Sequence, residues 1–126
     1  MSATILVVDG DPVFRFCLKI SLQEAGFVVH LAPNVQEALA ILPKVEIDLL
    51  MIDAKCVEGA GSRLGSALRI SRQLPVILMA SSKSPEDMMA AFVAGADAYV
   101  TKPFSLGDVR ASIQQQIQSA SLPMHS

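Results

Sequence analysis

Two aspartates and one lysine are the residues of this chain best placed to do chemistry. Asp9 and Asp53 each end an apolar run that is typical of a buried strand, and Lys102, followed by Pro103, comes just after another. In an open parallel α/β sheet the carboxyl ends of the strands lie along one edge, so these side chains are expected to share a crevice. One carboxylate can carry a phosphoryl group, a second can hold a cation, and an ammonium can neutralise charge. The pattern therefore predicts phosphoryl chemistry at that edge.

The elements that must position these residues alternate short apolar runs with amphipathic segments. Five strands are expected, at residues 4–9, 27–31, 49–52, 76–79 and 98–101. Each is expected to lead into a helix, and the first helix should run from about residue 12 to 25. Right-handed crossovers between parallel strands then predict a three-layer α/β/α sandwich.

The face that each helix buries is predicted from the spacing of its apolar residues. In chain order these residues are Val13, Phe16, Cys17 and Ile20; Val35, Ala38, Leu39 and Leu42; Leu64, Ala67 and Leu68; Met89, Phe92 and Val93; and Leu106, Val109, Ile113 and Ile117. Asn34, Ser84 and Ser105 are expected to cap the second, fourth and fifth helices, because their side-chain oxygens can accept from free amides.

The composition fits one compact domain. The chain has 126 residues, of which 52% are hydrophobic and 17% charged, with a formal net charge of -2 that argues against direct nucleic-acid binding. Cys17 and Cys56 lack metal-site spacing and are interpreted as reduced thiols. The N-terminus has neither a signal-peptide core nor an apolar span of roughly 20 residues, so a cytoplasmic protein without membrane association is expected. The domain is expected to span 3–118, with 119–126 a tail or the start of a linker.

Taken together, residues 3–118 resemble the receiver domain of two-component response regulators. Asp53 matches the phosphoacceptor of that family, Asp9 the first member of its acidic pair, Lys102 its lysine before a proline, and Tyr99 its switch aromatic. The resemblance implies a flavodoxin-like fold with a five-stranded parallel sheet in the order 2-1-3-4-5 and five helices.

The resemblance also implies a mechanism. Asp53 would take a phosphoryl group from a sensor histidine kinase or a phosphotransfer protein and would switch an interaction face for a downstream protein or a fused output domain. A Mg²⁺ ion would be held by Asp9, Asp53 and the backbone carbonyl of Lys55, and a cis bond before Pro103 would aim Lys102 into the crevice. A monomer or weak dimer is expected, and no enzyme activity beyond catalysis of its own phosphorylation and dephosphorylation.

Two active-site positions depart from the family pattern. The second acidic residue, a direct metal ligand, falls on Gly10, so the Mg²⁺ requirement is expected to be weak. Asp11 is a candidate replacement, although an aspartate before Pro12 is also typical of a helix N-cap. Ala80 stands where the family has the Ser or Thr that contacts the phosphoryl group. Ser81 could substitute only if the strand ends early or bulges.

Lys55 leaves two interpretations open: an ammonium that folds over Asp53 in place of the metal, or a solvated loop lysine. Three classes of function are considered. One is a phosphorylatable receiver; another, favoured by Gly10 and Ala80, is a pseudo-receiver that docks proteins independently of phosphate. A phosphatase-like hydrolase with Asp53 as nucleophile is a third, but no second aspartate follows at the spacing of a general acid.

Overall fold

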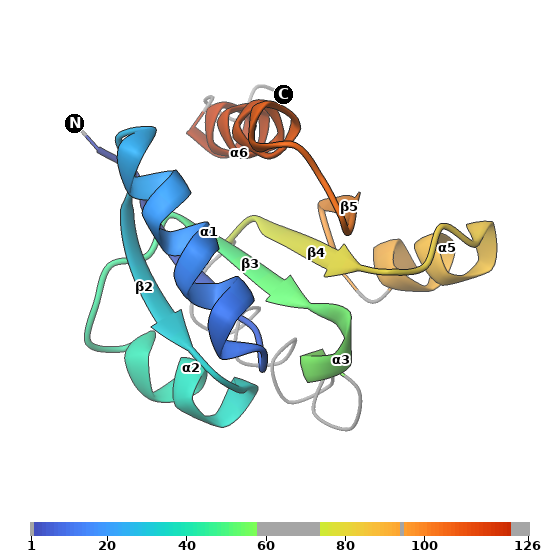
Figure 1. The fold of residues 1–126 in the computed structure, drawn as a ribbon, viewed down its shortest axis with the longest axis horizontal. Helices are drawn as coiled ribbons and strands as arrows, with labels where there is room; N and C mark the ends of the chain where they lie inside the picture. The colour runs from blue at the N-terminus through green and yellow to red at the C-terminus, as the bar shows by residue number, and fades with distance from the viewer. Residues whose placement is uncertain (1, 58–73, 94, 122–126) are drawn as a thin grey trace, which may run out of the picture.

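The computed structural model describes residues 2–57, 74–93 and 95–121. Its strands are β1 (Thr4–Val8), β2 (Val28–Ala32), β3 (Leu49–Asp53), β4 (Val76–Ala80) and β5 (Ala98–Thr101). Its helices are α1 (Pro12–Glu24), α2 (Val35–Ile41), α3 (Ala54–Val57), α5 (Pro85–Val93) and α6 (Leu106–Ser121) (Figure 1). The short helix α3 was not predicted, and the helix predicted around Leu64, Ala67 and Leu68 lies outside the described residues.

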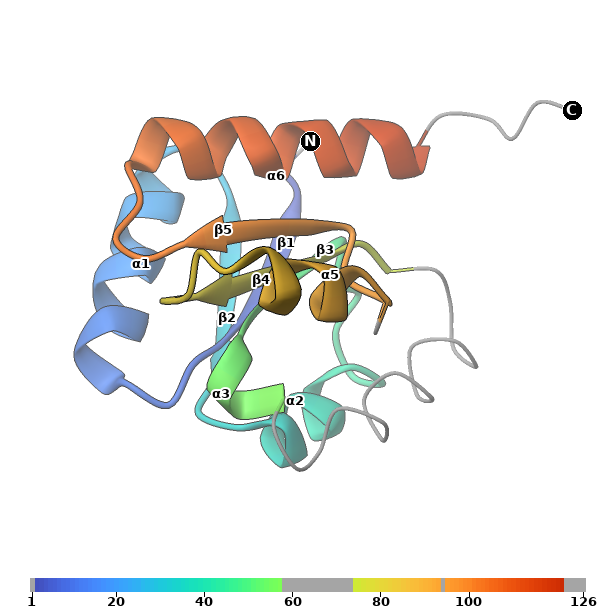
Figure 2. The same cartoon turned by 90° about the vertical axis from the view of Figure 1, so that its right-hand side faces the viewer.

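The five strands form one parallel sheet in the order β2-β1-β3-β4-β5, which confirms the predicted fold class. Figure 2 shows α6 on one side of the sheet and α2 and α3 on the other. The central strand β3 is buried at all five positions, as expected for a parallel strand covered on both faces. The register pairs Val8 of β1 with Ile52 of β3, so these two strands end side by side.

Alternate residues of the central strands point into two separate core layers. Ile5 and Val7 pack with the buried residues of α1 and α6, whereas Leu6 and Val8 pack with those of α2. The sheet is therefore covered by packed side chains on both faces, and its carboxyl edge carries the residues that follow each strand.

The predicted buried face of α1 is wrong. Val13, Phe16 and Ile20 are 70%, 56% and 41% exposed, Cys17 is exposed, and Leu18 and Leu22 are the buried residues of this helix. Apolar residues occur almost all round α1, so their spacing fits more than one stripe. The position of the sheet decides which stripe is covered.

The prediction for α5 fails for the same reason. Met89, Phe92 and Val93 are 64%, 44% and 77% exposed, and the buried residue of the helix is the small Ala91. A small residue lets a helix approach the sheet closely, so here the large apolar side chains are left on the outer face.

The other two predicted faces are largely confirmed. In α2, Val35 and Ala38 are buried, and Leu39 and Leu42 are partly buried against the core. In α6, Val109 and Ile113 are buried and Ile117 is partly buried, whereas Leu106 is exposed at the start of the helix. The helix continues to Ser121, so the segment predicted as a tail or the start of a linker is helical at its start.

The three predicted caps are present. Asn34 Oδ1 accepts from the Glu37 amide at 2.9 Å, Ser84 Oγ from the Asp87 amide at 3.3 Å, and Ser105 Oγ from the Asp108 amide at 3.1 Å. Within the described residues, no helix is both long and apolar enough to cross a bilayer.

Truncating a side chain on the buried face of α1 should cost much more stability than truncating one on its exposed face. Leu22→Ala should lower the free energy of unfolding by about 2–5 kcal/mol, because it leaves a cavity beneath the helix. Val13→Ala, on the exposed face of the same helix, should change it by no more than about 0.5 kcal/mol. Urea unfolding followed by circular dichroism measures both, and equal losses would contradict the observed orientation of α1.

Candidate functional site

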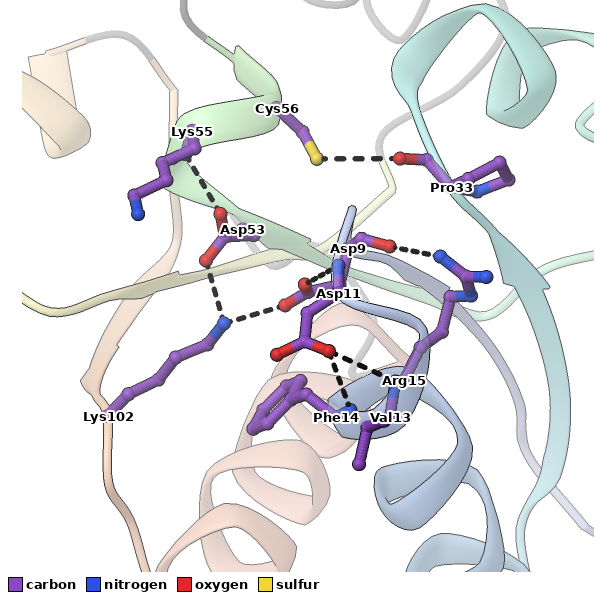
Figure 3. A network of polar contacts seen from close by, with 10 residues as sticks. All are labelled: Asp9, Asp11, Val13, Phe14, Arg15, Pro33, Asp53, Lys55, Cys56 and Lys102. Carbon is purple, nitrogen blue, oxygen red and sulfur yellow. Dashed lines mark hydrogen bonds and ion pairs between the residues drawn. The ribbon is translucent and has the colours of Figure 1, made fainter.

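The predicted crevice forms at the carboxyl edge of the sheet and brings together Asp9, Asp53 and Lys102 (Figure 3). Asp9 follows β1 directly and Asp53 is the last residue of β3, so the two carboxylates stand at neighbouring strand ends. Lys102 follows β5, which lies beyond β4, and its long side chain reaches back across that strand. Its backbone amide donates to the Ala80 carbonyl at 2.7 Å, and its peptide bond to Pro103 is cis, as the resemblance implied.

A single ammonium joins the two carboxylates. Lys102 Nζ lies 2.7 Å from Asp9 Oδ2 and 2.9 Å from Asp53 Oδ1. Asp9 is 2% exposed and Asp53 8%, so both are shielded from water. Buried carboxylates are stable only when they are paired and hydrogen-bonded. Lys102 is therefore the counterion on which this pair of acids depends.

Backbone amides bind the two remaining carboxylate oxygens. Asp9 Oδ1 accepts from the Asp11 amide at 2.9 Å, and Asp53 Oδ2 accepts from the Lys55 amide at 3.1 Å. Each of the four oxygens thus has a donor from this chain. The arrangement fixes both carboxylates before any ligand arrives.

Phe14 covers the ammonium from the side of α1. Lys102 Nζ lies 4.0 Å from the centroid of the Phe14 ring, and Phe104 packs edge-on against that ring at a centroid distance of 5.9 Å. A cation over an aromatic face is attracted to the electron density of the ring. Sequence reasoning missed Phe14, although its place in the helical turn directly after Asp9 was a usable signal.

Arg15 is a second residue that sequence reasoning missed. Its Nη1 donates to the backbone carbonyl of Asp9 at 2.6 Å (Figure 3). The contact ties α1 to the turn that carries Asp9 and adds a positive charge beside the crevice.

Two shifted pKa values reflect this environment. Burial lowers the pKa of Lys102, but the hydrogen bonds and charges of Asp9 and Asp53 outweigh it and leave the pKa above the ordinary lysine value. Burial and then the charge of Asp53 raise the pKa of the Cys56 thiol, which donates to the Pro33 carbonyl at 3.9 Å. Cys56 is therefore a protonated, weakly reactive thiol at neutral pH.

Asp11 is the N-cap of α1, which confirms the prediction made from its position before Pro12. Its Oδ1 accepts from the amides of Val13 and Phe14 at 3.0 and 3.3 Å, and Pro12 occupies the first position of α1. The side chain is thus engaged by the helix, while its own backbone amide holds Asp9.

The strand that carries Ala80 is regular to its end. The register of β4 and β5 runs without a break to the pair Ala80 and Thr101, and the exposed Ser81 follows the strand. The early end or bulge that Ser81 would need is not present. Tyr99 is partly buried and its hydroxyl donates to the Ser82 carbonyl at 2.8 Å.

The structure supports the interpretation of Lys55 as a solvated lysine. Its side chain is exposed, and the contact to Asp53 that Figure 3 marks comes from the Lys55 backbone amide and not from the ammonium. Among the described residues, the ion pair to Asp53 comes from Lys102.

The residues present are a poor fit for Mg²⁺. Gly10 removes one acidic ligand, and the oxygens of Asp9 and Asp53 are already bound by N–H groups. Within the described part of the chain, no group of three His, Cys, Asp or Glu side chains could hold a metal ion.

The cap of α1 predicts a measurable loss of stability. Asp11→Ala should lower the free energy of unfolding by about 1 kcal/mol, because two helix amides lose their acceptor. Asp11→Asn should retain most of that stability, since its side-chain oxygen can accept the same bonds. Equal losses in the two variants, measured by urea unfolding, would contradict the capping role.

The raised pKa of Lys102 predicts how stability depends on pH. A group whose pKa is higher in the folded state stabilises that state fully below its unfolded pKa, near 10.5, and loses this effect as the pH rises through the folded value. The difference in unfolding free energy between the wild type and Lys102→Met should therefore hold through neutral pH and shrink in the alkaline range. Lys44→Met, at an exposed lysine outside the crevice, is the matched control. A difference that persists unchanged at high pH would contradict the ion pairing.

Known proteins resemble this chain over most of its length. The family model described as the response regulator receiver domain matches residues 5–114. The transcriptional regulatory protein SrrA of Staphylococcus aureus is 32% identical over 109 residues, which cover 86% of this chain and 45% of that protein. The chain thus spans about half the length of the curated relatives it matches.

Solved structures agree with the family match. A receiver domain protein from Clostridium thermocellum has a TM-score of 0.85 at 26% identity, covering 97% of this chain and 99% of that one. A CheY-like receiver domain protein from Methanospirillum hungatei JF-1 has a TM-score of 0.83 at 27% identity, covering 94% and 96%. Receiver domains are signalling modules and are generally not enzymes; they typically bind Mg²⁺ at the phosphorylation site and interact with histidine kinases and output domains. With its sheet order, its crevice and the matched residues, this chain belongs to the response regulator receiver domains of two-component systems.

Proposed function

We propose that Asp53 is the phosphoacceptor of this receiver domain and that a sensor histidine kinase or a phosphotransfer protein is the donor. The observation that carries the proposal is the position of Asp53 at the end of β3, with Oδ1 2.9 Å from the Lys102 ammonium. A buried carboxylate beside a fixed cation can receive a phosphoryl group, because the cation offsets the negative charge that the phosphoryl oxygens bring into a site shielded from water.

The chemistry is a single displacement at phosphorus. An Asp53 oxygen forms a bond to phosphorus as the bond from phosphorus to the imidazole nitrogen of the donor breaks, and the leaving imidazole takes a proton from solvent. The product is an acyl phosphate. Lys102 offsets the charge of the phosphoryl oxygens, and its present contact with Asp53 places it close to where they would arrive. We expect only a weak dependence on Mg²⁺, because Gly10 lacks the carboxylate of the usual ligand.

The response to phosphorylation would reach the face formed by α5, β5 and α6. Tyr99 lies on β5 and its hydroxyl holds the segment after β4 through Ser82. Ala80 has no hydroxyl to pull toward a phosphoryl group, so this response would depend on Lys102 and the chain that follows it. A downstream protein or a fused output domain would read the change, and α5 carries the exposed apolar residues Met89, Phe92 and Val93.

A phosphate-independent docking module is the second candidate. The observation in its favour is that Lys102 and two backbone amides already satisfy both carboxylates. A site that is complete without phosphate can hold one conformation permanently, and its partners would then recognise the unmodified domain.

Phosphorylation of Asp53 is tested by intact mass. After incubation with acetyl phosphate or phosphoramidate, with and without Mg²⁺, the wild type should gain one phosphoryl group. Asp53→Asn should gain none, because an amide oxygen is too weak a nucleophile. Asp97→Asn, which alters an exposed carboxylate that binds the Val76 amide, should gain as the wild type does. No gain under any condition would reject the phosphoacceptor and favour the docking module.

A further inference from the structure

The charge balance of the crevice differs from that of a site built for a divalent cation. Asp9 and Asp53 supply two negative charges, and the Lys102 ammonium lies within 2.9 Å of both. One excess negative charge remains among these three side chains, and the nearby Arg15 guanidinium, bound to the Asp9 carbonyl, and the Asp11 carboxylate, which caps α1, carry opposite charges (Figure 3). The electrostatic attraction for a second cation is therefore small.

Each carboxylate oxygen already accepts one donor of this chain, so a metal ion would have to share that oxygen or displace the donor. The Lys102 ammonium takes one oxygen from each acid, and the amides of Asp11 and Lys55 take the others. Mg²⁺ is smaller than an ammonium, demands octahedral oxygen ligands and loses its waters reluctantly. Binding that displaced the Lys102 ammonium would have to offset the loss of two ion pairs in a buried site.

Aromatic rings hold the Lys102 ammonium in addition to the two ion pairs. The Phe14 ring faces Nζ at 4.0 Å and is itself backed by Phe104. Phe14 belongs to the first turn of α1, where its amide is capped by Asp11. The rings and the two acids thus confine the end of the Lys102 side chain, which is only 21% exposed.

Gly10 is the residue that leaves the site with two carboxylates and one ammonium. A Cβ built on Gly10 would meet only the Pro33 carbonyl, at 3.8 Å, which is ordinary contact, and Gly10 has no positive φ that would demand glycine. The backbone would accept an acidic residue there. Its absence is thus a property of the sequence and not a requirement of the fold.

From these observations we infer that the Lys102 ammonium is the resident cation of the unphosphorylated site, in place of a divalent metal ion, and that the missing carboxylate at Gly10 is the cause. Asp9 then acts as an anchor for Lys102. A single acidic residue at Gly10 would convert the crevice into a divalent-cation site, because three carboxylates would leave two excess negative charges beside one ammonium.

The test is a titration of the 126-residue chain with MgCl₂ at constant ionic strength, followed in amide ¹H–¹⁵N spectra. The amides of Asp11 and Lys55 are direct reporters, since each donates to one of the two carboxylates. Gly10→Asp adds the carboxylate, and Gly10→Asn is its neutral control of nearly equal shape. Lys102→Met removes the ammonium and leaves Gly10 in place.

We expect saturable binding in Gly10→Asp at least about tenfold tighter than in the wild type, since one added charge close to a divalent ion is worth more than this factor. Gly10→Asn should bind Mg²⁺ no better than the wild type. Lys102→Met should bind it more tightly than the wild type, because its carboxylates are released. That variant also keeps the inference testable if Gly10→Asp does not fold, as judged by circular dichroism.

Two results would overturn the inference. One is saturable Mg²⁺ binding by the wild type within about threefold of Gly10→Asp. The other is no gain in Gly10→Asp or in Lys102→Met when the variant is folded. The inference rests on the site of the proposed function, but its test measures metal binding in the absence of any phosphodonor. A domain that takes no phosphate can therefore still pass this test, and a domain that is phosphorylated can fail it.

Discussion

The burial of two carboxylates at neighbouring strand ends is the constraint on which the rest of this site depends. Two like charges about 4 Å apart repel by about 4 kcal/mol at the effective dielectric of a protein. That is a large part of the about 5–15 kcal/mol that keeps a domain folded. Asp9 and Asp53 can therefore stay buried together only beside a cation, and Lys102, at 2.7 and 2.9 Å, supplies it. The sheet order matters because it places the end of β5 within reach of β1 and β3.

The first turn of α1 shows how closely structure and chemistry are joined here. Asp11 holds Asp9 through its backbone amide and caps the helix through its side chain. That helix then presents Phe14 to the Lys102 ammonium and Arg15 to the Asp9 carbonyl. The turn after β1 thus fixes a carboxylate, and the helix that it starts confines the counterion. A receiver that lacks an acid at Gly10 can still keep an ordered crevice by these means.

The sequence predicted the fold and the central residues of the site well, because both depend on short-range patterns. Apolar runs of strand length identified all five strands, and Asn34 and Ser105 marked helix starts that the structure confirms. The buried faces of α1 and α5 were predicted wrongly, since apolar residues surround both helices and Ala91 rather than Phe92 lies against the core.

The sequence by itself determined that Asp9, Asp53 and Lys102 would meet, because parallel strands align their carboxyl ends whatever the details of packing. Only the tertiary structure decided how they meet. Whether Lys55 or Lys102 would neutralise the acids depends on where each side chain can lie, and the structure leaves Lys55 in solvent while β5 directs Lys102 inward. Phe14 enters the site for the same reason: its contact with Lys102 joins α1 to the end of β5 through packing across the sheet, which no local pattern of residues specifies.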